Sequence, residues 1–327
     1  MTKADAEAEL TKLVQPVNEA RGLVEYSLQG FTRHVVFPWY ERKWKPSTAM
    51  TTKDRVDHHL LKEQGNRPLS SFNRTILQDF LDRKASAGLS TSTVGHLRWD
   101  LRQIFRMAVN DGLLQRNPAE LLHAPTRNHQ RDKRVLSLDE LRTLLAALPL
   151  REKLVISLAG ISGLRPGEIL GLQWHDLQPD GLHITRGIYR GIIQTPKTHH
   201  SVRTAAISTS IREDFTAWRE TTPDAKEDNW VFPNEPGNKP VSHGNYWRRY
   251  LKPTLDKLKL NGVTFQALRR TAVTLLNANG ADATIVAAQC GHTVDVSTNV
   301  YNKVGIKRQQ EAIDHLTTAL AKQEPLQ

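Results

Sequence analysis

The sequence predicts a mainly α-helical fold with a small antiparallel β-sheet, divided into two domains. Apolar residues recur every three or four positions over most of both halves, which is the period of an amphipathic helix. The period changes over residues 182–207, where short runs typical of strands occur. A basic stretch follows Pro125 and separates the two halves. A chain of 327 residues is long enough for two domains.

Five segments follow from these patterns. They are a polar N-terminal helix or extension (1–27), a helical domain (28–125), a basic linker (126–135), a mixed α/β domain (136–318) and a C-terminal tail (319–327).

The composition favours a polyanionic partner. The formal net charge is +11, and neutralising phosphates releases counterions, so double-stranded DNA is the default partner. A basic soluble protein without such a partner is the alternative. The single cysteine, Cys290, excludes an internal disulfide and fits a reducing cytoplasm. No apolar run would span a bilayer and the N-terminus lacks an apolar signal core, so we expect a cytoplasmic protein without membrane contact.

The helical domain begins with an aromatic and basic stretch, residues 31–44, which would either stack on nucleic acid or form the edge of a core. Helices are expected over 47–63, after the cap Asn73, and after Ser90 or Ser92. The last and longest of these has an apolar stripe made of Val94, Leu97, Leu101, Ile104, Phe105 and Ala108. Asn117, with Pro118 and Glu120 behind it, predicts one more helix start.

Basic residues give this half and the linker two candidate DNA contacts. The polar face of the longest helix carries His96, Arg98, Arg102 and Arg106, and it would lie along DNA or face solvent. The linker carries Arg131, Lys133 and Arg134, and it would cross a phosphate backbone or remain a flexible solvated connector.

The second domain begins with a capping box, Ser137 with Glu140. A buried apolar helix follows and ends at Gly163, which places Arg165 in a turn. Pro166 then begins a helix with Glu168 in its first turn. Arg165 is therefore placed either for a bidentate phosphate contact or for a structural pair with Glu168.

The predicted sheet lies in the middle of this domain. Residues 182–185, 188–194 and 202–207 read as short strands separated by Gly187, Gly191 and the turn Thr195-Pro196-Lys197-Thr198. Lys197, on the turn tip, would reach a groove or donate a proton, although most loop lysines do neither.

Capped helices are expected to complete the domain. They cover about 210–220, a stretch after Ser242 that carries Arg248, a helix after Thr264, and a helix after Asp282 with Ile285, Val286 and Ala288 inward. Gln266 and Arg269 are three residues apart on the helix after Thr264. Gly291 ends the next helix and leaves His292 at its end, and Tyr301 falls on a last short helix. Residues 309–322 are amphipathic and would dock on their own domain or on a neighbouring subunit.

Five of these residues, in order and with their neighbours, resemble the tyrosine recombinase, or phage integrase, family. They are Arg165 in GLRPGE, Lys197 in TPKT, Arg269 in QALRRT, His292 in CGH, and Tyr301. The resemblance covers roughly residues 28–318 and implies a helical core-binding domain followed by a catalytic domain. It implies a tetramer on DNA, joined through the C-terminal tail, in the bacterial cytoplasm or nucleoid.

The family's chemistry, carried onto these positions, implies a role for each residue. Tyr301 attacks the scissile phosphate, forms a 3′-phosphotyrosyl bond and releases a 5′-hydroxyl. Arg165 and Arg269 hold the non-bridging oxygens, where negative charge develops. Lys197 protonates the leaving oxygen and His292 donates to the phosphate, while Glu168 braces an arginine. The covalent bond retains the phosphodiester's energy, so no nucleotide cofactor is expected. The spacing of the histidine pairs His58-His59 and His199-His200 does not indicate a metal site, so no metal is expected either.

Gln266 departs from the family, which usually has histidine three residues before the second arginine. An amide still donates a hydrogen bond to a phosphate oxygen, but it does not exchange a proton near neutral pH. We interpret Gln266 as a retained donor; the competing interpretation is a weakened enzyme.

Three functions fit these residues. The first is a site-specific recombinase that integrates or excises a mobile element. The second is a type IB topoisomerase-like nicking and closing enzyme, and the third is a DNA-binding protein with an inactive site. The tail after Tyr301 and the modest chain length favour recombination. The inactive protein is disfavoured by the presence of Tyr301, Arg165, Arg269, Lys197 and His292.

Overall fold

The computed structural model describes residues 26–125, 133–194, 202–237 and 239–292. The chain divides into two compact units, Met1–Arg131 and Asp132–Gln327, whose boundary falls inside the expected linker. The expected N-terminal helix, Arg131, Lys197, Tyr301 and the amphipathic tail lie outside the described residues.

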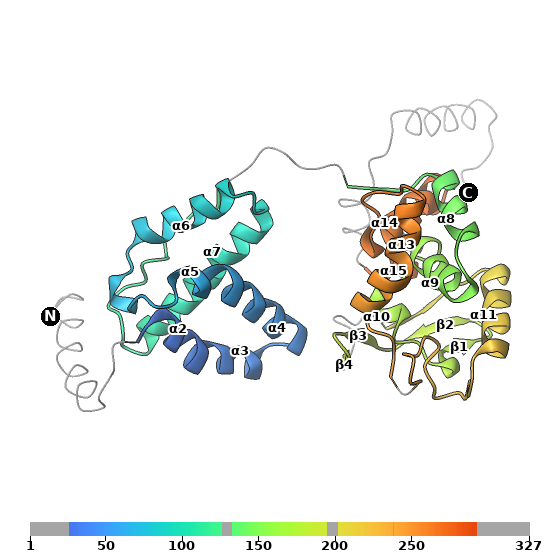
Figure 1. The fold of residues 1–327 in the computed structure, drawn as a ribbon, viewed down its shortest axis with the longest axis horizontal. Helices are drawn as coiled ribbons and strands as arrows, with labels where there is room; N and C mark the ends of the chain where they lie inside the picture. Colours follow the sequence, from blue (N-terminus) through green and yellow to red (C-terminus); the bar gives the residue numbers. More distant parts are fainter. Residues whose placement is uncertain (1–25, 126–132, 195–201, 238, 293–327) are drawn as a thin grey trace, which may run out of the picture. The chain divides into compact units, whose positions relative to one another are not determined.

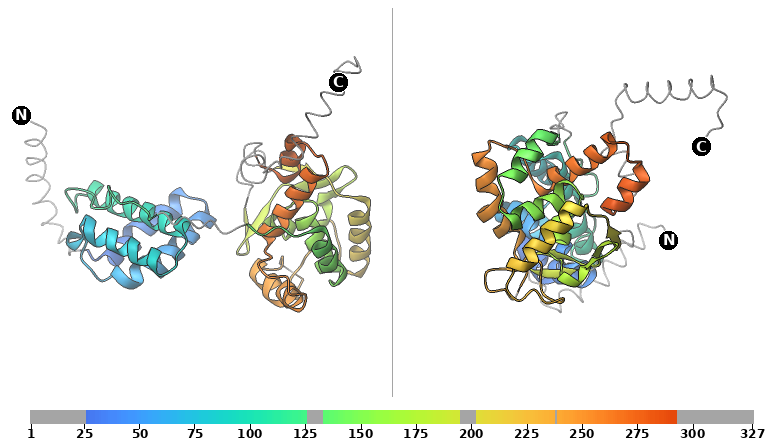
Figure 2. Two further views of the ribbon diagram at one scale, coloured as in Figure 1. Left: turned by 90° about the horizontal axis from the view of Figure 1, so that it is seen from above. Right: turned by 90° about the vertical axis from the view of Figure 1, so that its right-hand side faces the viewer.

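The first unit is a bundle of helices, coloured blue to green in Figure 2. Its first stretch is one continuous helical run made of α2 (Leu28–Phe31), η1 (Thr32–Val36) and α3 (Phe37–Lys43). A second run consists of α4 (Pro46–Arg55), η2 (Val56–Leu61) and α5 (Lys62–Gln64). The short η3 (Leu69–Ser71), α6 (Arg74–Ser86) and α7 (Thr91–Asn110) follow.

Local capping and periodic burial explain these helices. The side chain of Asn73 accepts from the amide of Ile76 at 3.0 Å, and that of Ser90 accepts from Thr93 at 3.1 Å. The predicted stripe of α7 is fully buried along its whole length. Residues 26–125 therefore contain helices and no strand, as the sequence predicts.

The aromatic stretch belongs largely to the core of this unit. Phe31 and Tyr40 are fully buried, and the Tyr40 ring stacks on Trp44 with 3.8 Å between ring centroids. Trp44 in turn contacts Trp99 of α7, with 5.5 Å between centroids. Of the two interpretations of residues 31–44, the structure favours the edge of a core.

The prediction of a helix starting at Asn117 is wrong, because residues 118–121 form a single turn. The Asn117 side chain caps the amide of Ala119, but the turn does not continue. Gln78 of α6 holds His123 in another conformation by bonding both its amide and its carbonyl oxygen. Pro125 also disfavours a helical conformation in the residue before it.

The second unit has α9 (Leu150–Gly160) at its centre, and Figure 1 shows α14 (Phe265–Ala278) on one side of it and α11 (Thr209–Thr221) on the other. Helix α9 also contacts α8 (Leu138–Ala146) and α10 (Pro166–Ile169). The other helices in the described part of this unit are η4 (Trp174–Asp176), α12 (His243–Tyr246), η6 (Trp247–Leu251), α13 (Lys252–Lys257) and α15 (Ala283–Cys290).

The strands form two small antiparallel sheets instead of one. The first has the order β1 (Leu177–Gln178), β2 (Gly181–Ile184), β5 (Arg203–Ala205). The second is a hairpin of β3 (Gly187–Tyr189) and β4 (Ile192–Gln194). Arg190 and Gly191 lie between these two strands with φ of 49° and 80°, which is the backbone of a two-residue hairpin turn.

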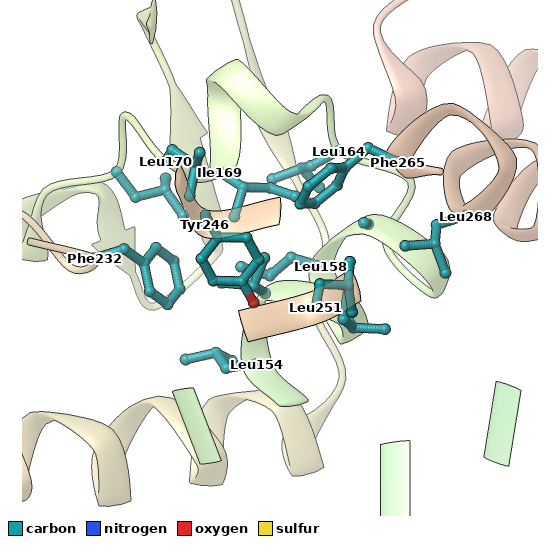
Figure 3. Close-up of a cluster of buried hydrophobic side chains, with 14 of the residues drawn as sticks. Leu154, Leu158, Leu164, Ile169, Leu170, Phe232, Tyr246, Leu251, Phe265 and Leu268 are labelled. Atoms are coloured by element: carbon teal, nitrogen blue, oxygen red, sulfur yellow. The ribbon is translucent and has the colours of Figure 1, made fainter. Parts of the chain in front are cut away.

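The core of the second unit lies between the helices around α9. Figure 3 shows Tyr246 of α12 among Leu154, Leu158, Phe232 and Leu251. All five are fully buried, so α9 is surrounded by apolar side chains from segments far apart in sequence.

Two helix predictions in this unit are corrected. Helix α9 ends at Gly160, and the Gly163 that was expected to end it lies in the following turn. Ile285, which was expected to face inward on α15, is 62% exposed, and Ala288 is also exposed. Val286, Ala287 and Cys290 are the buried residues, because they face α14 and β5.

Among the described residues, no helix has the length and the apolar character needed to cross a membrane.

Candidate active site

The C-terminal end of α15 is the centre of the candidate site. Asp282 caps the start of this helix, and Gly291 ends it with a left-handed backbone, φ 64°. The last carbonyl groups of a helix have no partner inside the helix and carry partial negative charge. Here three consecutive carbonyls each accept from an arginine: Gln289 from Arg203 Nε at 2.9 Å, Cys290 from Arg269 Nη2 at 2.6 Å, and Gly291 from Arg165 Nη2 at 2.7 Å.

Arg165 precedes α10 and is the most accessible of the three arginines. Its amide donates to Glu168 Oε2 at 2.9 Å and its Nη1 to Glu168 Oε1 at 2.7 Å. Its side chain is nevertheless 39% exposed. A guanidinium has five N–H donors, so Arg165 keeps donors for a ligand after these contacts. The two interpretations of Arg165 from the sequence are thus compatible, since the pair with Glu168 leaves part of the guanidinium exposed.

Glu168 is a buried carboxylate shared by two arginines. Arg203 donates to it from Nη1 at 3.2 Å and from Nη2 at 3.0 Å, in addition to the contacts from Arg165. Burial alone would raise the pKa of Glu168. The hydrogen bonds and charge of Arg203, with the charge and amide of Arg165, outweigh burial and hold the pKa below its ordinary value. Glu168 is therefore ionised at neutral pH and fixes both guanidinium groups.

Arg269 comes from the first half of α14 and is largely buried. Thr264 caps this helix by accepting from Ala267 at 3.0 Å, so the position of Arg269 is set within two turns of the helix start. Arg269 Nη1 donates to the carbonyl of Gly163, and only 7% of the residue is exposed. Burial and the neighbouring charge of Arg165 lower the pKa of Arg269, but an arginine remains protonated near neutral pH.

Gly163 lies close to α15 in this site. Its φ is 71°, and a Cβ placed there would lie 2.7 Å from Cys290 Sγ. A glycine is therefore required for the turn that brings its carbonyl to Arg269. Burial raises the pKa of Cys290, so its thiol is a packing group here.

His292 follows the glycine that ends α15. Its amide donates to the carbonyl of Ala287 at 3.2 Å, and the residue is half-buried. A hydrogen bond of this kind closes the end of a helix when the residue after the helix has a left-handed backbone, as Gly291 does. The position of the His292 backbone is therefore set by Gly291.

Gln266 is exposed in the first turn of α14, three residues before Arg269. Its side chain makes no hydrogen bond to another described residue. The amide is therefore available to an added ligand, as its interpretation as a donor requires.

Charge makes the end of α15 suited to an anion. Three guanidinium groups meet at this helix end, two of them share the single carboxylate of Glu168, and the side chain of Arg165 is 39% exposed. Arginine holds phosphate oxygens through paired N–H donors, and a phosphate would here supply the missing negative charge. Among the described residues, no group of three or more histidine, cysteine or acidic side chains is placed to hold a metal ion.

The other candidate DNA contacts are spread over both units. In the first unit, Arg98 donates to the carbonyl of Leu122 at 3.3 Å, and Arg102 pairs with Glu120 at 2.5 Å. Arg106 is exposed and bonds only Gln103 among the described residues, at 2.5 Å. Two arginines of the basic face of α7, Arg98 and Arg102, therefore have a structural role, because they bind the segment that follows the helix.

In the second unit, Lys133 and Arg248 are exposed. Arg134 is tied to Glu140 of the capping box and to the carbonyl of Val135. Arg131, Lys197 and Tyr301 lie outside the described residues. The structure therefore brings together Arg165, Glu168, Arg269 and His292, with Gln266 three residues from Arg269 on the same helix.

Arg203 is the site residue that sequence reasoning missed. It occupies the first position of the short strand β5, where a cation reads as solvent-facing. Its partners lie 35 and 86 residues away in the sequence. No local pattern identifies such a residue.

The second unit matches a known sequence family. The family model described as the phage integrase family matches residues 134–308, more than half of the chain. A protein described as tyrosine recombinase XerC-like from Caldanaerobacter subterraneus is 24% identical, over 96% of this chain and 89% of its own length. The ICEBs1 integrase of Bacillus subtilis is also 24% identical, over 84% of this chain and 79% of its own length.

Solved structures share the fold. The Tn1549 transposon integrase in complex with a circular intermediate DNA aligns with a TM-score of 0.73 and 17% identity, covering 89% of this chain and 99% of its own. A lambda integrase dimer bound to a core site aligns with a TM-score of 0.66 and 18% identity, covering 90% and 84%. A lambda integrase tetramer bound to a Holliday junction aligns with a TM-score of 0.66 and 16% identity, covering 86% and 81%.

Proposed function

This chain belongs to the phage integrase family of tyrosine recombinases, enzymes that cleave DNA and transfer strands, and we propose that it recombines specific double-stranded DNA sites to integrate or excise a mobile element. One observation carries the assignment of the site. Three arginines converge on the last carbonyls of α15, with a half-exposed guanidinium at Arg165. That arrangement suits a phosphodiester group.

The proposed reaction begins with the hydroxyl of Tyr301. Its oxygen loses its proton to solvent and attacks the scissile phosphorus, the bond to the 5′-oxygen breaks, and a 3′-phosphotyrosyl bond forms. Arg165 and Arg269 stabilise the charge that develops on the non-bridging oxygens. Lys197 gives the leaving 5′-oxygen its proton, and His292 donates a hydrogen bond to the phosphate.

The second half of the reaction restores the DNA. The 5′-hydroxyl of a partner strand attacks the phosphotyrosine, and the tyrosine oxygen leaves with a proton. Each step exchanges one phosphoester for another, so no nucleotide is consumed. Gln266 supplies a neutral hydrogen-bond donor to the phosphate, where other members of the family usually have histidine.

DNA binding relies on basic side chains that are accessible. Arg106 of the first unit and Lys133 and Arg248 of the second are exposed, which supports their assignment as phosphate contacts. Arg98, Arg102 and Arg134 hold their own domains together, so they would reach DNA only after exchanging these partners. Arg131 completes the basic linker. A bacterial cytoplasm is the compartment in which such a protein would meet its DNA.

Assembly on DNA is proposed to use the tail. Lambda integrase forms a dimer and a tetramer on DNA in the solved structures. The second unit has an apolar groove of about 420 Å³, lined by residues that include Leu138, Leu141, Leu145, Ile161, Leu275 and Leu276. The stripe Ile313, Leu316 and Leu320 belongs to the amphipathic segment 309–322, which runs into the tail, and it has the apolar character to fill such a groove on a neighbouring subunit.

A nicked suicide substrate tests the proposed function. Loss of the short strand beyond the cleavage site prevents religation, so the enzyme remains joined to the DNA. We expect a covalent adduct with the wild type and no adduct with Tyr301→Phe. A protein that binds this DNA but forms no adduct would be a DNA-binding protein, and nicking and closing without strand exchange would indicate a topoisomerase-like enzyme.

A further inference from the structure

Arg203 is a buried arginine that bridges two elements of the site, as the more exposed Arg165 also does. Its side chain is 7% exposed, and it joins two elements of the site that no chain segment joins directly. From Nε it donates to the carbonyl of Gln289 at 2.9 Å, and from its two terminal nitrogens it donates to Glu168. Arg203 thereby connects the first turn of α10 to the last turn of α15.

Arg203 also packs directly against Gly291. A Cβ at Gly291 would lie 2.7 Å from Arg203 Nη1 and 2.9 Å from its Cζ. The guanidinium therefore lies directly against the glycine that ends α15 and that precedes His292. If Arg203 moved, the turn at Gly291 would lose this packing contact and the hydrogen bond to the carbonyl of Gln289.

Helix α15 is also fixed to the strand that carries Arg203. The side chain of Gln289 accepts from the amide of Ala206 at 2.9 Å and donates to its carbonyl at 3.0 Å. The residue after the strand and the helix end are thus joined by a pair of hydrogen bonds, and Arg203 extends from the strand to the helix end.

We propose that Arg203 is a positioning residue, which holds the end of α15 and the Glu168 carboxylate so that Arg165 and His292 meet the phosphate in the right geometry. It does not contact DNA, because its guanidinium is buried and used by protein acceptors. The catalytic part of this inference rests on the proposed function, whereas the structural part does not.

Hydrogen exchange tests the structural part without any reaction. The amide of Gly291 bonds the carbonyl of Ala287 at 2.8 Å, and loss of the arginine should loosen this helix end. In Arg203→Met, exchange of the amides of residues 283–292 should be faster by about 10-fold, the scale of one lost charge-assisted hydrogen bond. Unchanged protection would overturn the proposal whatever the activity.

Arg212→Met is the matched control. Arg212 of α11 also donates to two backbone carbonyls, those of Gln178 at 3.0 Å and Pro179 at 3.3 Å, but it has no contact with α15. Its loss should leave the exchange of residues 283–292 unchanged. Faster exchange in both variants would mean a general loss of stability and would contradict the proposal.

Single-turnover cleavage tests the catalytic part. At saturating suicide substrate, Arg203→Met should cleave about 100-fold more slowly, as expected for a displaced catalytic group, with a DNA Kd within about 3-fold of the wild type. A weakened Kd with normal cleavage at saturation would identify Arg203 as a DNA contact and overturn the proposal. A wild type that forms no adduct would refute the proposed function, while the exchange result would still decide the role of Arg203.

Arg203→Lys covers the case in which Arg203→Met does not fold. Lysine keeps the charge but has one nitrogen, so it would pair with Glu168 or with Gln289 but not with both. We expect the amide protection of residues 283–292 and the cleavage rate of Arg203→Lys to lie between those of the wild type and those of Arg203→Met. Protection and cleavage equal to the wild type would overturn the account, because the bridge itself would then be unnecessary.

Discussion

The Nη2 atom of Arg165 donates to the carbonyl oxygen of Gly291 at 2.7 Å, across 126 residues of sequence. This contact joins the start of α10 to the end of α15. It means that the group proposed to hold the phosphate is held by the same backbone turn that leads into His292. This hydrogen bond therefore links the two ends of the phosphate site, alongside the bridge that Arg203 makes.

Replacing Arg165 should separate catalysis from binding. Arg165→Ala removes a donor aimed at developing charge, so cleavage of a suicide substrate should fall by about 100-fold or more. Gel-shift affinity should change by less than about 3-fold, since many phosphate contacts remain. Lys226→Ala is the control, because Lys226 is an exposed cation paired with Asp224. Normal cleavage by Arg165→Ala would show that the phosphate assignment is wrong.

Replacing Gly291 should destabilise the protein more than replacing Gly280, because Arg203 packs against Gly291. Gly280 and Gly291 both have positive φ, but a Cβ at Gly280 meets no atom within 4 Å. Gly280→Ala should therefore lower the unfolding free energy by about 1 kcal/mol, the backbone cost alone. Gly291→Ala should lower it by about 2 kcal/mol or more, since Arg203 must also leave Glu168 or Gln289. Urea unfolding compares them, and equal losses would contradict the described packing.

The stability of the second unit should depend on the ionisation of Glu168. Because the folded state lowers the pKa of this carboxyl below the ordinary 4.5, the carboxylate's contribution is complete above that value. It is lost as the pH falls through the lower folded pKa. Glu168→Gln lacks this contribution, so the unfolding free energies of variant and wild type should converge in acid.

An exposed acid provides the comparison for this titration. Glu235 pairs with Arg249 and its side chain is 74% exposed, so Glu235→Gln should follow the wild-type profile. Denaturant unfolding at several pH values gives the unfolding free energy of the wild type, Glu168→Gln and Glu235→Gln. A constant difference between Glu168→Gln and wild type over the whole acid range would refute the role of the ionised carboxylate.

Gln266 offers a test of the hydrogen-bond interpretation. Gln266→His restores the residue that the family usually has, on an exposed first turn where no packing opposes it. Cleavage should remain similar or become faster, whereas Gln266→Ala should lose about 3- to 10-fold with the missing donor. A large loss in Gln266→His, measured by single-turnover cleavage, would contradict equivalence between the amide and the imidazole.

Sequence reasoning succeeded where the physics is local. The caps Asn73, Ser137, Thr264 and Asp282 each bond amides two or three residues away, so a short pattern contains all the information. The stripe of α7 was equally clear, because twenty residues provide several turns of periodicity. The mainly helical fold with little sheet followed from these elements.

It failed where a residue depends on distant partners. Arg203 occupies a three-residue strand and finds both acceptors only after the chain folds. The inward face of α15 was misassigned at Ile285, because a helix of eight residues has too few turns to fix its orientation. The helix expected at Asn117 had a good start, but Gln78 holds the following segment elsewhere.

The nucleophile is the central claim, and peptide mapping of the trapped adduct tests it most directly. Protease digestion of the wild-type protein joined to a nicked suicide substrate, followed by mass spectrometry, identifies the amino acid that carries the DNA 3′-phosphate. The account predicts a phosphotyrosyl bond on the peptide that contains Tyr301. A DNA phosphate on any other residue, or an adduct that persists in Tyr301→Phe, would contradict it.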